Sequence, residues 1–139
     1  MNAAADAHNN PMTGDTDTID LYDRALDRFV RFHPAVVDLA SELTAVDAPA
    51  PMSLALMAYL NLMSTDADDL DAVRALWQAL SQTEANEREQ AHHAAIGDWL
   101  NGNWHDASAR LDDVLSRWPT DLLALMLGHQ LDFFLGDAQ

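Results

Sequence analysis

The 139-residue chain contains no cysteine, no lysine and no long hydrophobic run. Without cysteine it forms neither a disulfide framework nor a thiolate site. Its seven basic residues are all arginine and stand against 23 acidic ones, which gives a formal net charge of −16. That balance excludes nucleic-acid binding along phosphates, which needs clustered lysine and arginine, and it disfavours docking on anionic lipid.

No stretch approaches the roughly 18 apolar residues of a membrane span. The opening MNAAADAHNNPMTGDTDT has neither the basic start nor the apolar centre of a signal peptide. We therefore expect a soluble, cytoplasmic protein with no membrane partner. Most of the acids are aspartate, a bias that fits either GC-rich coding or adaptation to high salt.

Helical periodicity is what the sequence does contain. Residues 1–17 are small and polar and predict a disordered arm, whereas residues 18–139 predict one helical domain. Apolar residues recur there at three- and four-residue spacing in about seven segments, including 86–101, 104–118 and 122–135. Thr16 or Thr18 is expected to cap the first helix, Gly102 to end the fifth and Asp121 to begin the seventh. No segment predicts a strand, so the fold class is all-α.

Gly102 and Gly136 lie 34 residues apart, and 34 residues is the period of the tetratricopeptide repeat. We place Gly102 at the turn between the two helices of one repeat. Further consensus positions then fall in register on Trp104, Ala107, Leu111 and Pro119. The clearest repeat covers residues 88–121, and a second begins at residue 122 and is cut short. We therefore expect antiparallel helical hairpins stacked as a tetratricopeptide-like, right-handed solenoid.

Residues 86–138 resemble the N-terminal part of the tetratricopeptide repeat protein 38 family. The residues that carry the resemblance are Arg88-Glu89, His92 or His93, Trp99, Gly102, Pro119, Asp121 to Leu125, His129, Phe134, Gly136 and Asp137. LYDRALDRFVRF and PMSLALMAYLNLM also fit the family's beginning. Members run to several hundred residues, so the resemblance implies that this chain is the front part of a longer protein. It implies a fold and a scaffold role, with no established catalytic activity.

In this register the first helix of each repeat lines the concave face of the solenoid. A groove there would take an apolar or basic peptide, although its residues could equally pack on neighbouring helices. The candidate groove residues are Glu89, His92, His93, Ile96, Trp99, Met126, Gln130 and Phe133.

The segment 122–135 is apolar nearly all round, and Leu131, Phe134 and Leu135 predict an apolar edge. Missing repeats would cover this edge, and so would a second copy of the chain in a homodimer through the same helix. The expected partner is therefore a protein or peptide, including the chain itself.

Glu89-x-x-His92 puts a carboxylate and an imidazole on one helical face, the spacing used in helical di-iron sites. Such a pair arises often by chance, and a metal would also need His129 and Asp132, so these four are weak candidates and no cofactor is expected. The competing function is an enzyme or small-ligand site built from Glu89, His92, His93 and His129. Exposed, converging histidines would favour that site, and scattered ones favour the leading hypothesis, a non-catalytic interaction scaffold.

Overall fold

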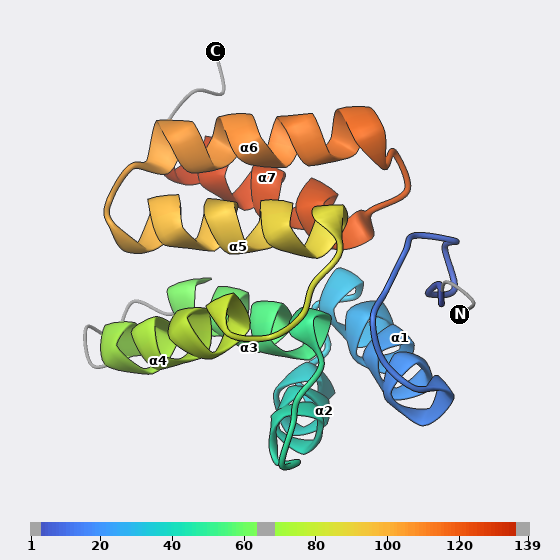
Figure 1. Cartoon of the computed structure of the whole chain (residues 1–139). Helices are drawn as coiled ribbons and strands as arrows, with labels where there is room; N and C mark the ends of the chain where they lie inside the picture. The colour runs from blue at the N-terminus through green and yellow to red at the C-terminus, as the bar shows by residue number, and fades with distance from the viewer. Residues whose placement is uncertain (1–3, 64–68, 136–139) are drawn as a thin grey trace.

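The computed structural model describes residues 4–63 and 69–135. Its helices are α1 (Thr16–Val30), α2 (Ala35–Thr44), α3 (Pro51–Met63), α4 (Asp69–Ser81), α5 (Glu87–Leu100), α6 (Trp104–Arg117) and α7 (Leu122–Leu135) (Figure 1). These residues contain no strand, only an isolated bridge between Ala5 and Pro11. The prediction of an all-α chain with about seven helices is confirmed for this part of the chain.

Neighbouring helices pack as antiparallel pairs, α3 with α4, α5 with α6 and α6 with α7 (Figure 1). α5 also packs on α3 and α4, so the layer of α5, α6 and α7 covers the α3–α4 hairpin. α1 packs on α2 and reaches the same layer through α7. Each described helix is too short or too polar to traverse a lipid bilayer.

Both ends of α5 follow signals in the sequence. The Asn86 side chain accepts the Glu89 amide at 2.9 Å, and the Glu89 carboxylate accepts the Asn86 amide at 2.9 Å, which makes a capping box. At the other end Gly102 has a φ of +81°, and two hydrogen bonds close a Schellman turn around it. The predicted end of this helix at Gly102 is confirmed.

α1 begins and ends in ways that the sequence did not indicate. Asp15 caps it by accepting the Thr18 amide at 2.7 Å, so the cap is neither Thr16 nor Thr18. α1 ends in a Schellman turn of the same kind as the one after α5, but here Phe32 occupies the left-handed position, with a φ of +57°. This backbone conformation strains a bulky residue, and the Phe32 ring is 70% exposed.

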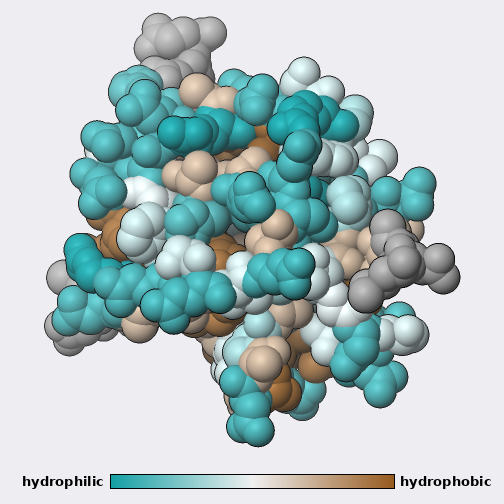
Figure 2. Space-filling model, viewed as in Figure 1, coloured by the Kyte–Doolittle hydropathy of each residue, from teal (hydrophilic) through white to brown (hydrophobic). Residues whose placement is uncertain are grey.

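α3 lies at the centre of the core with none of its residues exposed, whereas each of the other helices has exposed residues as well as buried ones. Fully buried side chains include Leu56 and Tyr59 of α3, Ile96 of α5, Leu111 of α6 and Leu127 of α7. The space-filling view of the α4, α5 and α6 side is largely hydrophilic, as the charge of −16 requires (Figure 2). Outside α3, most acidic residues of the helices face water, and Glu89 is a buried exception.

The helical spacing of Trp77, Trp104 and Trp118 predicts that all three lie in the core, and for Trp104 this prediction is wrong. This residue is 39% exposed, because it is the first residue of α6 and lies outside the face that Ala107, Leu111 and Val114 bury. Trp77 and Trp118 are half-buried and pack against the core.

Residues 4–13, the arm, differ from the expected disordered segment. The chain folds back on itself here, with the Met12 amide donating to the Ala4 carbonyl at 3.0 Å. Met12 is 1% exposed and belongs to the main hydrophobic core, and Asp6 and Asn10 are also buried. Small, polar composition suggested disorder, but contacts to distant residues hold the arm on the helices.

Candidate functional site

The first turn of α5 buries a guanidinium group. Arg88 Nε donates to Asp121 Oδ2 at 2.9 Å, and Nη1 donates to the Pro11 carbonyl at 2.9 Å. Its Nη2 lies 3.4 Å from Asp6 Oδ2, and all three side chains are fully buried. A buried charge is costly unless it is paired, and two carboxylates pair this one. Arg88 therefore ties α5 to the start of α7 and to the arm.

Asp121 holds the centre of this network. Its Oδ1 accepts the Ala124 amide at 3.0 Å and caps α7, as the sequence predicted. Its Oδ2 faces both Arg88 and His92, with His92 Nε2 at 2.8 Å. Burial would raise the pKa of this carboxyl, but the charges and hydrogen bonds of His92 and Arg88 outweigh burial and hold the pKa well below its usual range. Asp121 is therefore ionised at neutral pH.

His92 extends the network to α3. Its Nδ1 lies 2.8 Å from the Tyr59 hydroxyl, while its Nε2 faces Asp121. An ionised carboxylate can only accept, so Nε2 carries a proton and donates to Asp121, while Nδ1 is in contact with the Tyr59 hydroxyl. The resulting order of hydroxyl, imidazole and carboxylate is the one that hydrolytic triads use.

These three groups are nevertheless sealed inside the protein. Tyr59, His92 and Asp121 are all fully buried, so no substrate reaches the hydroxyl. Burial also raises the pKa of Tyr59 well above 10, which keeps the phenol neutral. A neutral phenol without access to substrate is not a nucleophile. The triad-like order is a structural tie between α3, α5 and α7.

Three buried polar atoms where the arm meets α1 and α5 lack a hydrogen bond: Asp6 Oδ2, Arg88 Nη2 and the Tyr22 hydroxyl. Burial raises the pKa of Tyr22, and Arg88 lies close enough to oppose that shift. Buried polar atoms normally make hydrogen bonds, and here Asp6 Oδ2 and Arg88 Nη2 are held together by charge at 3.4 Å instead.

Glu89 and His93 flank this network but point elsewhere. The Glu89 carboxylate accepts both the Thr13 amide, at 2.6 Å, and the Thr13 hydroxyl, at 2.7 Å. His93 stacks on Trp77 with ring centroids 4.7 Å apart, and burial lowers its pKa. Trp77 Nε1 donates to the His93 carbonyl at 3.0 Å, which joins α4 to α5.

The structure separates the residues predicted to line one groove. Glu89, His92, Ile96 and Trp99 are buried, and α3 packs against this helix, where the Tyr59 ring lies 6.2 Å from that of Trp99. On α7, Met126 and Gln130 are half-buried and Phe133 is 75% exposed.

The structure also does not group the residues predicted to form an apolar edge, nor the four metal-ligand candidates. Leu131 is fully buried, and the side chains of Phe134 and Leu135 lie outside the described residues. His129 is exposed on α7, where Asp132 accepts from Ser108 at 3.2 Å. The described residues hold no group of three or more histidines and acids arranged to bind a metal.

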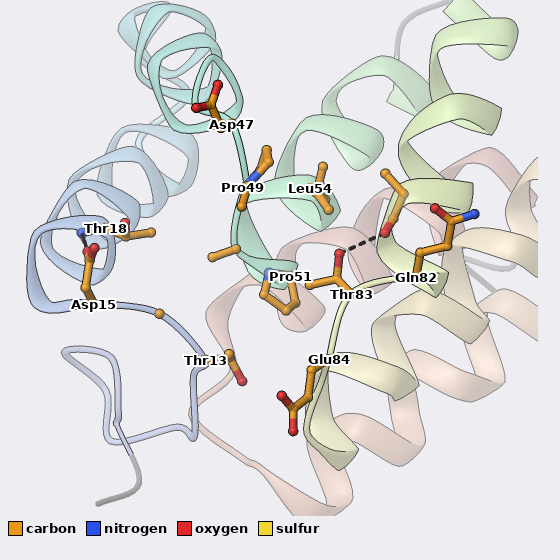
Figure 3. Close-up of a pocket in the computed structure, with 14 residues that line it drawn as sticks. Thr13, Asp15, Thr18, Asp47, Pro49, Pro51, Leu54, Gln82, Thr83 and Glu84 are labelled. Carbon is orange, nitrogen blue, oxygen red and sulfur yellow. Dashed lines mark hydrogen bonds between the residues drawn. The ribbon is translucent and has the colours of Figure 1, made fainter. Parts of the chain in front are cut away.

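An open groove lies elsewhere, where four segments meet at one end of the helices (Figure 3). Its volume is about 540 Å³, which is in the range of ligand sites. The arm and the start of α1 form one wall, and the end of α4 with residues 82–84 forms the opposite wall. The α2–α3 loop and Leu54 complete it. The α2–α3 loop and residues 82–84 are far apart in sequence, so only the fold brings them to face each other.

Acids and apolar side chains line this groove. Asp15, Asp47 and Glu84 carry its charges, and no arginine or histidine lines it. Asp47 and Glu84 make no hydrogen bond or ion pair with the described residues, whereas Asp15 caps α1. The groove is therefore a concave surface with uncompensated negative charge and a floor of proline, alanine and leucine. None of the predicted groove residues lines it.

No protein-family model matches this chain, and no solved structure matches it. Its function is therefore argued from the groove, the buried network and the arm.

Proposed function

We propose that the chain is a non-catalytic helical scaffold that binds a basic segment of a protein partner in the groove of Figure 3. The observation that carries the proposal is the uncompensated charge of Asp15, Asp47 and Glu84 around an open hollow of about 540 Å³. A partner's arginine or lysine would pair with these carboxylates, and its apolar stem would lie on Pro49, Pro51 and Leu54.

The charge of the whole chain supports the same class of partner. With 23 acids and seven arginines, the surface attracts basic segments and repels acidic ones over distances of about a Debye length. Complementary charge raises the rate of association and selects among partners. The proposed complex should therefore weaken as salt is added.

Within the described residues, the separate positions of the four residues of the competing site support a scaffold over an enzyme. Glu89 and His92 are buried in separate contacts, His93 stacks on Trp77, and His129 lies exposed on α7. His92, His93 and His129 are thus scattered, the arrangement that favours the scaffold hypothesis over the enzyme.

We also propose that the described helices belong to a tetratricopeptide-like solenoid in the cytoplasm. Support comes from the antiparallel order of α5, α6 and α7 and from Gly102 at the turn between α5 and α6. Ala107 and Leu111, which occupy consensus positions of the repeat, are fully buried.

The groove is tested by removing its charge. The probe is a fluorescein-labelled peptide with two arginines separated by two leucines, and anisotropy measures its binding. We expect Asp47→Asn combined with Glu84→Gln to weaken binding about tenfold, a loss of roughly 1.4 kcal/mol. Raising the salt concentration from about 50 to about 300 mM should also weaken binding to the unmodified chain.

The control is Asp112→Asn combined with Asp113→Asn, the same change in net charge at two exposed residues of α6. This variant should bind the peptide as the unmodified chain does. If both double variants lose the same affinity, binding reflects overall charge alone, and the groove is not the site.

The homodimer through α7 has less support than the groove. Among the side chains of α7 that the structure describes, Leu125, His129, Asp132 and Phe133 are exposed, so this part of the outward surface mixes apolar and polar groups. Leu123, Leu127 and Leu131, which made the helix look apolar all round, are buried against the rest of this chain.

A further inference from the structure

The arm rests on a surface that recognises peptide backbone. Both oxygens of Asp23 accept the Ala7 amide at 3.1 Å, and Glu89 accepts the Thr13 amide. Arg88 donates to the Pro11 carbonyl. The Thr120 hydroxyl donates to the His8 carbonyl at 2.9 Å, and the Thr120 carbonyl accepts from Asn10 Nδ2 at 3.1 Å. Side chains from α1, α5 and the α6–α7 turn thus bind backbone groups along the arm.

Arm side chains add specificity to these contacts: the Asn10 amide and the Thr13 hydroxyl donate to Thr120 and Glu89, and Asp6 and Met12 are the two buried anchors. The Asp6 carboxylate reaches towards the buried Arg88 guanidinium, and six residues on, Met12 inserts into the hydrophobic core with 1% of its surface exposed. A charged anchor followed by an apolar one is a common pattern of peptide recognition.

The arm does not form hydrogen bonds with every polar group of the surface beneath it. Arg88 Nη2 and Asp6 Oδ2 form a long ion pair of 3.4 Å without a hydrogen bond, and no hydrogen bond of ordinary geometry reaches the Tyr22 hydroxyl, which lies close to Arg88. The Asp6 carboxylate is held back because its Oδ1 accepts the His8 and Asn10 amides within the arm itself. A carboxylate free of those bonds could approach both donors, since an arginine fork matches a carboxylate.

We propose that the surface beneath the arm is a peptide-binding site, distinct from the groove, which the arm fills as an internal ligand. The site takes a segment with one carboxylate and, about six residues on, an unbranched apolar side chain. The carboxylate binds Arg88 and Tyr22, the apolar side chain replaces Met12, and Asp23 and Glu89 hold the backbone. Because the arm is tethered, a competing peptide must overcome its high effective concentration.

The test loosens the arm in the full chain and offers the same segment from solution. The variant is Met12→Ala, and the probe is fluorescein-labelled AADAHNNPMT, the sequence of residues 4–13. We expect the variant to bind this peptide about tenfold more tightly than the unmodified chain does, because its own arm competes less. A peptide with Asp6→Asn should bind about tenfold more weakly, since the guanidinium loses its charged partner.

Met52→Ala is the matched control, because it truncates a fully buried methionine of α3 outside the arm. It should bind no more peptide than the unmodified chain. Equal binding by both variants, or a folded Met12→Ala chain that binds none, would overturn the proposal.

Hydrogen exchange of the unmodified chain provides a second measurement that does not depend on the variant folding. The amides of Ala7 and Thr13 should exchange through local opening, faster than that of Ile96 in the centre of α5. If the arm amides exchange only as slowly as Ile96, the arm is a permanent part of the core and not a displaceable ligand.

Discussion

At the scale of single residues, α1 and α5 end in the same turn with different side chains at its left-handed position. Gly102 occupies it after α5, and Phe32 after α1. A left-handed conformation costs a residue with a Cβ about 1–2 kcal/mol, whereas glycine adopts it freely. We expect Phe32→Gly to raise the free energy of unfolding by about 1 kcal/mol, measured by urea denaturation.

Gly102→Ala is the mirror-image control for this prediction. No atom lies within 4 Å of the Cβ that alanine would add, so backbone strain is the only penalty. This substitution should lower the free energy of unfolding by about 1 kcal/mol. If Phe32→Gly destabilises the chain, the exposed Phe32 ring makes contacts worth more than the strain.

Asp121 makes stability depend on acid pH. Its pKa in the folded chain is below the ordinary value of 3.8, so folding favours the ionised form. This stabilisation is complete above about pH 4 and is lost as the pH falls through the folded-state pKa. We expect Asp121→Asn to lower the free energy of unfolding at pH 7 by about 3–5 kcal/mol, because Arg88 loses its closest partner. Urea denaturation between about pH 2 and pH 7 measures both effects.

Asp15→Asn separates the ion pair from the helix cap in this experiment. Asp15 caps α1 as Asp121 caps α7, but it is exposed and pairs with no cation. Asparagine is an equally good cap, so this variant should unfold at nearly the same urea concentration as the unmodified chain. An equal loss in both variants would show that capping, and not the pairing with Arg88, stabilises the fold.

At the scale of helices, Gly97 sets how closely α5 approaches α4. A Cβ at this position would lie 2.9 Å from Trp77 Nε1, and the rigid indole is held by its hydrogen bond to the His93 carbonyl. We expect Gly97→Ala to destabilise the chain by about 1–3 kcal/mol and to change the tryptophan fluorescence, because the ring must move. Thermal unfolding followed by circular dichroism measures the loss.

Gly128→Ala makes the same substitution where there is room. Gly128 is within α7, and no atom lies within 4 Å of the added Cβ. Alanine is the better helix former by about 1 kcal/mol, so this variant should be more stable than the unmodified chain. A loss of stability in both variants would point away from the contact with Trp77.

Helix limits were predictable where side chains near in sequence determine them. The glycine at 102 and the cap at Asp121 act within a few residues, and the structure has both as expected; the capping box of Asn86 and Glu89 is equally local. The all-α class follows from the same local periodicity. The prediction that Trp104 is buried was wrong, because helical spacing identifies one face of α6 but not how far along the helix that face is covered.

The sites depend on residues far apart in sequence, and spacing could not reveal them. Arg88, His92 and Asp121 were recognised as part of a resemblance, yet nothing indicated that Tyr59 and Asp6 would join them. The arm looked disordered because its composition is polar, and its partners lie up to 112 residues away. Only the folded chain brings these groups together.

At the scale of the whole molecule, the chain has two surfaces of opposite character. The groove gathers carboxylates around an open hollow, whereas the surface beneath the arm gathers a buried guanidinium and unpaired donors. Thr13 contributes to both, because it lines the groove and binds Glu89. A ligand that displaces the arm would therefore also move one wall of the groove.

The contact between Asn10 and Thr120 spans 110 residues, and this has a consequence for the chain as a ribosome makes it. At roughly 5–20 residues per second, Asn10 waits about 6–22 s before Thr120 is even synthesised. Arg88 is made only late in that interval, and 33 further residues, roughly 2–7 s of synthesis, separate it from Asp121, so the new α5 at first carries this cation without its carboxylate partner. The arm and Arg88 would then reach their final contacts only after the α6–α7 turn has emerged from the ribosome.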